Sequence, residues 1–176
     1  MNRKAIGAAG LLVLLALGLV IGWANRPDRP PLAPGARADR VVVDKSKRTL
    51  ALLAGTDTLK LYEVSLGGSP TGHKGQEGDE RTPEGTYLLD YRNPRSSMHR
   101  SLHVSYPDSA DVARARAAGV DPGGMIMVHG IYDGLGWLGR LHRLMDWTDG
   151  CIAVTNAEMD EIWRAVPDGT PIEIRP

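Results

Sequence analysis

Hydrophobic and polar positions follow a strand-like pattern through most of the chain. Short apolar runs, several of them alternating with polar residues, are separated by turn-forming Gly, Pro and Asp. This pattern predicts strands over residues 41–43, 49–53, 58–66, 86–91, 101–105, 125–128 and 172–174. It favours a mainly β or α+β fold with a few short helices over a sheet of repeated βαβ units.

Helical periodicity is limited to a few segments. Residues 109–118 have helix-forming composition between a cap candidate at Asp108 or Ser109 and a terminal Gly119. Residues 156–166 follow Thr155, and Glu158 three positions later completes a capping box. The buried face of this second helix is predicted to carry Met159, Ile162, Trp163 and Val166. Residues 135–145 stay ambiguous, because glycines interrupt their near-helical spacing.

The N-terminal segment is apolar and follows two basic residues. Ala5 to Ala24 carry no charge, which is about the length that a helix needs to cross a bilayer. Residues 1–25 are therefore predicted to be a signal peptide or an inner-membrane anchor, and both alternatives place the rest of the chain in the periplasm or cell envelope. Residues 26–38 contain four prolines and are predicted to form a linker, and residues 39–176 one catalytic domain.

Charge and histidine spacing argue against two classes of function. The 21 Lys and Arg balance the 21 Asp and Glu, so the chain lacks the basic surface that nucleic-acid binding needs. His99 and His103 lie in a predicted strand, where four residues span roughly 13 Å, too far for one metal ion. We therefore expect no metal. The long polar loop at residues 67–85 is predicted to form a wall of a functional cleft.

Cys151, the only cysteine of the chain, is the candidate nucleophile. A lone thiol in an exported protein is a liability unless it is buried or used. His129, at the end of an apolar run, is the candidate general base, since its ordinary pKa near 6.5 suits proton exchange near pH 7. Gly150 has no Cβ, so its backbone admits a close approach, and N–H groups at Gly150 and Cys151 are candidates for an oxyanion hole. A buried, purely structural cysteine is the alternative.

These residues together resemble a known family. Thr82-Pro83-Glu84-Gly85, His129-Gly130 and Thr148-Asp149-Gly150-Cys151 resemble, in order and spacing, the blocks of the L,D-transpeptidase catalytic domain of the YkuD type, over about residues 39–176. The resemblance implies a β-sandwich core that works without a cofactor on peptidoglycan stem peptides. It also implies an acyl-enzyme on Cys151, with transfer to an amine in cell-wall cross-linking or remodelling. Thr148 and Gly130 match supporting positions.

Two positions depart from the family pattern. Asp149 replaces a common His, and a carboxylate beside the thiol would raise its pKa. Ala153 replaces an Arg or Asn that can hold a substrate carboxylate. Arg81, Arg140 and Arg143 are candidate substitutes, and Trp137 is a further candidate for substrate binding. Three functions therefore stay open: a transpeptidase, a hydrolase (L,D-carboxypeptidase or amidase) on the same site, and a non-catalytic wall-binding domain.

Overall fold

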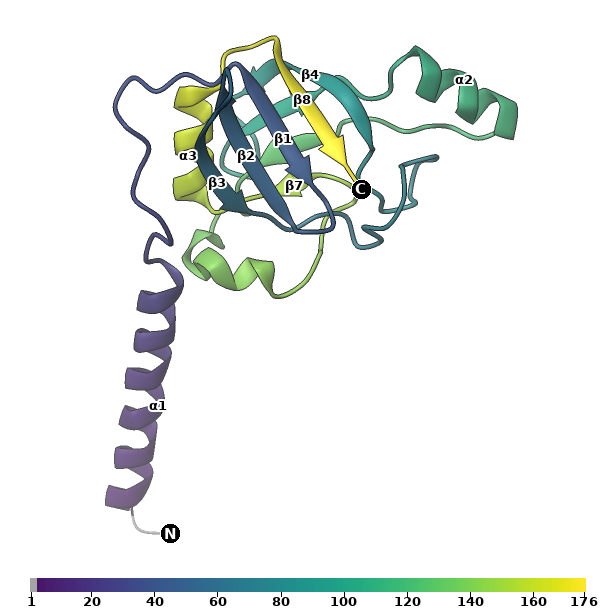
Figure 1. Cartoon of the computed structure of the whole chain (residues 1–176). Coiled ribbons are helices and arrows are strands. Elements are labelled where there is room, and N and C mark those ends of the chain that lie inside the picture. The colour runs from purple at the N-terminus through teal and green to yellow at the C-terminus, as the bar shows by residue number, and fades with distance from the viewer. Residues whose placement is uncertain (1–2) are drawn as a thin grey trace.

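The computed structural model describes residues 3–176, and these residues contain one mixed β-sheet of eight strands (Figure 1). In the sheet the strands lie in the order β3-β2-β1-β8-β4-β5-β6-β7, with the pairs β1–β8 and β6–β7 parallel and the other neighbours antiparallel. Their bounds are β1 Arg40–Asp44, β2 Thr49–Ala54, β3 Asp57–Glu63, β4 Gly85–Asn93, β5 Ser101–Val104, β6 Met127–His129, β7 Ile152–Ala153 and β8 Thr170–Arg175. The predicted fold class, sheet-dominated with a few short helices, is confirmed.

The two ends of this strand order meet. Ser65, just after β3, pairs with Ala153 on β7, and each backbone N–H donates to the carbonyl of the other at 3.0 and 2.9 Å. The sheet therefore folds back on itself around the core. Alternate residues of its strands point inward and are buried, as the period of two requires, among them Val41, Val43, Leu50, Leu52, Leu102, Val104, Ile172 and Ile174.

Two α-helices and one 3-10 helix accompany the sheet. Helix α3 (Asn156–Ala165) lies against the sheet and buries Met159 and Ile162, whereas α2 (Ser109–Ala118) projects away from it (Figure 1). Both helices begin with a complete capping box, at Asp108 with Asp111 and at Thr155 with Glu158. The predicted starts of both helices are confirmed. Trp163 is only half-buried and lies beneath the guanidinium groups of two arginines, Arg92 and Arg100.

The bounds of several helices and strands differ from those that the hydrophobic pattern predicts. Residues 136–144 form the 3-10 helix η1 (Gly136–Leu144), which breaks at Gly139, where φ is 48°. Strand β6 extends to His129, and β3 ends at Glu63, three residues earlier than expected. Strand β7 was not predicted, because two residues are too few for an alternation to appear. Its position beside β6 decides where Cys151 lies.

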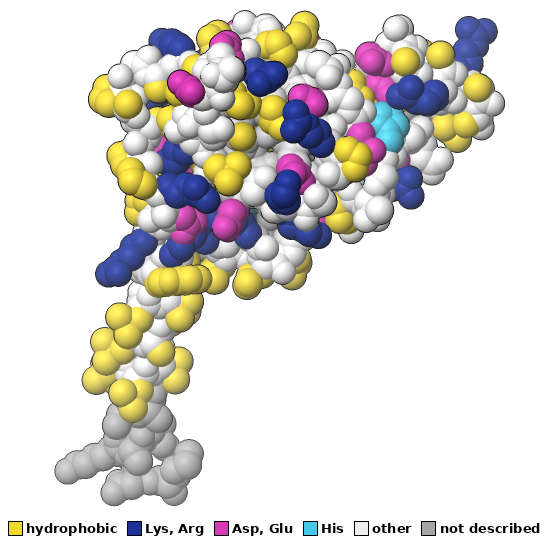
Figure 2. All heavy atoms as spheres, viewed as in Figure 1, with side chains coloured by type: hydrophobic (Ala, Val, Ile, Leu, Met, Phe, Trp, Pro, Cys, Tyr) yellow, Lys and Arg dark blue, Asp and Glu magenta, His cyan; other side chains and the backbone are white. Residues whose placement is uncertain are grey.

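The N-terminal helix α1 (Arg3–Ala24) ends on the domain, beside η1 (Figure 1). Asn25 donates a side-chain hydrogen bond to the carbonyl of Trp137 at 2.8 Å, and the Arg140 guanidinium lies 4.3 Å from the Trp23 ring. Figure 2 shows exposed hydrophobic side chains along the part of α1 that it colours. Met1, Asn2 and the side chains of the basic pair Arg3 and Lys4 lie outside the described residues. Within the described chain, no helix has the length and apolar character needed to cross a membrane.

Candidate active site

Strands β6 and β7 bring Cys151 and His129 to one place. In their parallel pairing Val128 lies opposite Ile152 and His129 opposite Ala153, so Cys151, one residue before β7, lies beside Met127. Side chains two residues apart on a strand share a face, which puts the 127 and 129 positions on one side. From standard strand dimensions, the Cα atoms of Cys151 and His129 are roughly 8 Å apart, within reach of the two side chains.

The thiol of Cys151 is held between two backbone groups of the preceding strand segment. The Met127 N–H donates to Sγ at 3.4 Å, and Sγ donates a long hydrogen bond to the Met125 carbonyl at 3.7 Å. Burial raises the pKa of the Cys151 thiol; the Met127 N–H opposes that rise, nearby Asp149 adds to it, and Lys74 also opposes it. The predicted effect of Asp149 is present, but burial is the larger cause. The resting group is therefore a thiol.

The His129 imidazole is buried, and its orientation is defined. Its Nδ1–H donates to the Gly130 carbonyl at 2.6 Å, which leaves Nε2 as the nitrogen that can accept a proton. Burial lowers the pKa of His129, and the hydrogen bond to Gly130 only partly opposes this. At neutral pH the expected forms are a neutral imidazole and a protonated thiol, in contrast to a preformed ion pair.

A tight turn presents the cysteine. Thr148 Oγ1 donates to the Cys151 carbonyl at 2.7 Å and accepts the Gly150 N–H at 3.3 Å, so one hydroxyl spans the turn. Gly150 has a φ of 121°, and a Cβ there would lie 2.5 Å from the Arg81 carbonyl oxygen. The turn therefore needs glycine both for its backbone conformation and for close packing against the chain's own loop.

The long loop at residues 67–85 forms that neighbouring wall and is organised by two buried lysines. Lys45, from the turn after β1, donates to the carbonyls of Gly72 and Thr82 at 2.6 and 2.9 Å and to Glu84 at 2.8 Å. Lys74 pairs with Asp79 at 2.8 Å. Although burial alone would raise it, the pKa of Asp79 falls to about 2, because Lys74 and three backbone N–H groups donate to its carboxylate.

Asn156 is a supporting residue that the sequence did not indicate. Its Oδ1 accepts the Ile131 N–H at 2.7 Å, immediately after the His129–Gly130 pair. A Cβ on Gly130 would lie 2.6 Å from that same oxygen, so Gly130 lets the first residue of α3 approach the strand end. In the sequence Asn156 is an ordinary helix-terminal residue, and only the approach of the start of α3 to the segment after β6 reveals this contact.

Comparison with known proteins agrees with this geometry. Residues 38–174 match the YkuD family, described as the L,D-transpeptidase catalytic domain. The chain belongs to the YkuD family. No curated protein sequence matches the chain.

Solved structures show the same fold in this YkuD domain's relatives. The helical cell shape determining protein Pgp2 from Campylobacter jejuni is similar with a TM-score of 0.61 and 21% identity, over 89% of this chain and 54% of that one. Bd1075 from Bdellovibrio bacteriovorus has a TM-score of 0.53 and 26% identity, over 79% and 48%. The L,D-transpeptidase from Xylanimonas cellulosilytica has a TM-score of 0.50 and 18% identity, over 83% and 64%. The chain spans 48% to 64% of the length of these three proteins.

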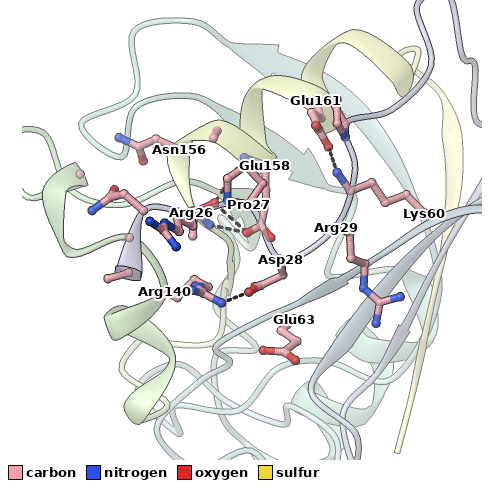
Figure 3. A pocket seen from close by; sticks show the side chains of 17 residues that line it. Arg26, Pro27, Asp28, Arg29, Lys60, Glu63, Arg140, Asn156, Glu158 and Glu161 are labelled. Carbon is pink, nitrogen blue, oxygen red and sulfur yellow. Dashed lines mark hydrogen bonds and ion pairs between the residues drawn. The ribbon is translucent and has the colours of Figure 1, made fainter. Parts of the chain in front are cut away.

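The three candidate arginines of the YkuD domain lie in different surroundings. Arg140 and Arg143 both pair with Asp28 of the linker, and Arg143 also pairs with Glu158 at 2.6 Å (Figure 3 shows Arg140, Asp28 and Glu158). Arg140 lines a cavity of about 370 Å³ between the linker, η1 and α3, whose lining includes neither Cys151 nor His129. Arg81 has an exposed side chain, its backbone packs on Gly150, and among the described residues it has no acidic partner.

Trp137, Trp147 and Ala153 lie in three different surroundings. Trp137 is half exposed on η1 and uses its carbonyl to accept Asn25, on the side of the linker. Trp147 instead packs edge-on against the His129 ring, with the two ring centroids 5.8 Å apart. Ala153 is fully buried and paired on both sides, so its side chain has no access to a ligand.

Proposed function

We propose that this YkuD domain is a cysteine-dependent L,D-transpeptidase that acts on peptidoglycan stem peptides. The observation that supports the proposal is the β6–β7 pairing, in which Cys151, the only cysteine of the chain, is two register positions from the buried His129, whose free nitrogen is Nε2. The family membership supports the substrate class. The domain works outside the cytoplasm, in the cell envelope, and residues 1–25 act as its export signal or its membrane anchor.

In the first half-reaction His129 Nε2 takes the Cys151 proton while Sγ attacks the carbonyl carbon of the third stem-peptide residue. The oxyanion that forms is stabilised by the Cys151 backbone N–H, because the Gly150 N–H already donates to Thr148. His129 then gives its proton to the leaving amine of the terminal D-alanine. The C–N bond breaks, and a thioester on Cys151 remains.

In the second half-reaction an amine of another stem peptide gives a proton to His129 and attacks the thioester. The product is a 3→3 cross-link, and the thiol is restored. Water in place of the amine would give a shortened peptide, which is the hydrolase alternative. Arg81 is our candidate for the substrate carboxylate, since Arg140 and Arg143 already hold linker and helix carboxylates.

Product analysis separates the three functions. The full chain is incubated with disaccharide tetrapeptides, and products are analysed by mass spectrometry. New 3→3 dimers support the transpeptidase, shortened monomers alone would replace it by a hydrolase, and unchanged substrate would favour a binding domain. Intact-protein mass should show an acyl adduct on the wild type and none on Cys151→Ala.

Matched histidine variants test the base. His129→Ala should lower the rate by roughly 10²–10⁴-fold, the range of general-base catalysis. His103→Ala is the control: His103 lies on strand β5, and its ring pairs with the exposed carboxylate of Asp90. Equal rates for the two variants would remove His129 from the mechanism.

A further inference from the structure

A second histidine is buried next to the proposed base, and the mechanism above does not use it. His142 lies on η1 with 6% of its surface exposed. Its Nδ1 accepts the indole N–H of Trp147 at 3.4 Å and also lies 3.3 Å from Oγ of Ser65, whose hydroxyl donates to the His142 backbone carbonyl at 3.1 Å. Because an indole N–H only donates, Nδ1 is the unprotonated nitrogen and Nε2 carries the hydrogen. This Nε2 is buried and has no partner among the described residues.

The indole that His142 holds is the one that packs on the base. The Trp147 and His129 rings meet edge-on at 5.8 Å and 70°, and the Trp147 and His142 rings at 6.3 Å and 88°. Tyr132 lies 6.2 Å from the indole. The ring of His129 therefore has two restraints: its own hydrogen bond to Gly130 and the indole beside it.

We propose that His142 is a positioning residue for the reaction at Cys151, acting through its hydrogen bond to Trp147 to fix the indole against the His129 ring. Held in this way, the His129 ring keeps one orientation, and a loosened ring loses it. The inference rests on the proposed function for its kinetic consequence, but the orientation of the His129 ring can be measured without turnover.

The charge state of His142 is suited to this role. Burial, then the nearby charges of Arg143 and His129, lower the pKa of His142 to about 3. His142 is therefore a neutral acceptor at neutral pH. It also adds no positive charge beside the imidazolium that forms on His129 during catalysis.

Three single variants and one double variant of the full chain test the acceptor role. His142→Leu removes the acceptor, Trp147→Phe removes the donor but keeps an aromatic ring, and His142→Asn places an amide oxygen near the position of Nδ1. We expect kcat/KM to fall by about tenfold or more in the first two, with KM nearly unchanged, since misalignment of reacting groups by about 1 Å can cost up to 10²-fold. His142→Asn should keep most of the activity, and the Leu/Phe double variant should be no worse than either single.

A readout independent of activity keeps structural and positioning roles apart. In a Cys151→Ala background, ¹⁵N spectra of His129 should show one tautomer, with Nδ1 protonated, and His142→Leu should turn this into a mixture. The thermal midpoint should change little, because the leucine replaces a buried imidazole that has an unpartnered Nε2. The proposal is overturned if His142→Leu leaves kcat/KM and the tautomer unchanged, or if His142→Asn is as impaired as His142→Leu. A wild type without turnover would refute the proposed function, and the tautomer measurement would still decide the role of His142.

Discussion

Replacing Lys45 by Met removes the cation that joins the end of β1 to the loop beside the site. The Lys45 side chain is 3% exposed, and its ammonium group donates to two loop carbonyls and to Glu84, which is 20% exposed. Removing one partner of a buried ion pair typically costs 3–5 kcal/mol. Because Glu84 retains some contact with water, we expect a loss of about 3 kcal/mol, which for a domain of this size lowers the melting temperature by roughly 10 °C.

Urea unfolding followed by tryptophan fluorescence measures this loss. Lys47→Met, two residues away, is the control: its ammonium is paired with Asp44, but the side chain is 73% exposed, so its loss should stay within about 1 kcal/mol. Adding Glu84→Gln to Lys45→Met should recover part of the stability, since no uncompensated carboxylate remains. If Lys45→Met and Lys47→Met lower the stability equally, the loop is not organised by the buried lysine.

Further predictions concern the site itself. Burial lowers the pKa of His129 and raises that of Cys151. We therefore expect kcat/KM to stay level from about pH 7 upward and to fall only below the ordinary histidine pKa of about 6.5. A decline between pH 7 and 8 would indicate a thiolate–imidazolium pair instead. Gly150→Ala should lower activity far more than Gly169→Ala. Both glycines have a positive φ, but only at Gly150 would the new Cβ lie 2.5 Å from a carbonyl oxygen. Similar activities of the two variants would contradict the packing argument. The Asp149 carboxylate raises the pKa of the Cys151 thiol. Asp149→Asn removes this charge and should therefore speed alkylation of Cys151 by iodoacetamide at pH 8. An unchanged rate would mean that the charge of Asp149 does not affect the thiol.

Local signals predicted several parts of this molecule well. The capping box at Thr155 and Glu158 predicted the start of α3, and the period of the apolar residues after it predicted the buried face except at Trp163, which is half-buried. The fold class followed from the alternating hydrophobic pattern, and the family from short motifs around Thr82, His129 and Cys151. These features depend on neighbours within a few residues, so a single sequence contains them.

Features that depend on distant contacts could not be predicted. Strand β7 is two residues long and exists only through pairing with β6 and Ser65. Lys45 and Lys74 look like solvent-exposed charges in the sequence, yet both are buried, Lys45 against the loop at residues 67–85 and Lys74 within that loop. Arg140 and Arg143 lie near Cys151 along the chain, but their carboxylate partners come from the linker and α3.

The pairing of Ser65 with Ala153 has a consequence for what the sheet can recruit. An unpaired strand edge invites another chain to add a strand, either as a ligand or as the start of aggregation. Beside Cys151 that edge is already occupied, because Ala153 pairs with β6 on one side and with Ser65 on the other. A peptide that reaches the thiol therefore cannot extend the sheet at β7, and two copies of the chain cannot join there edge to edge.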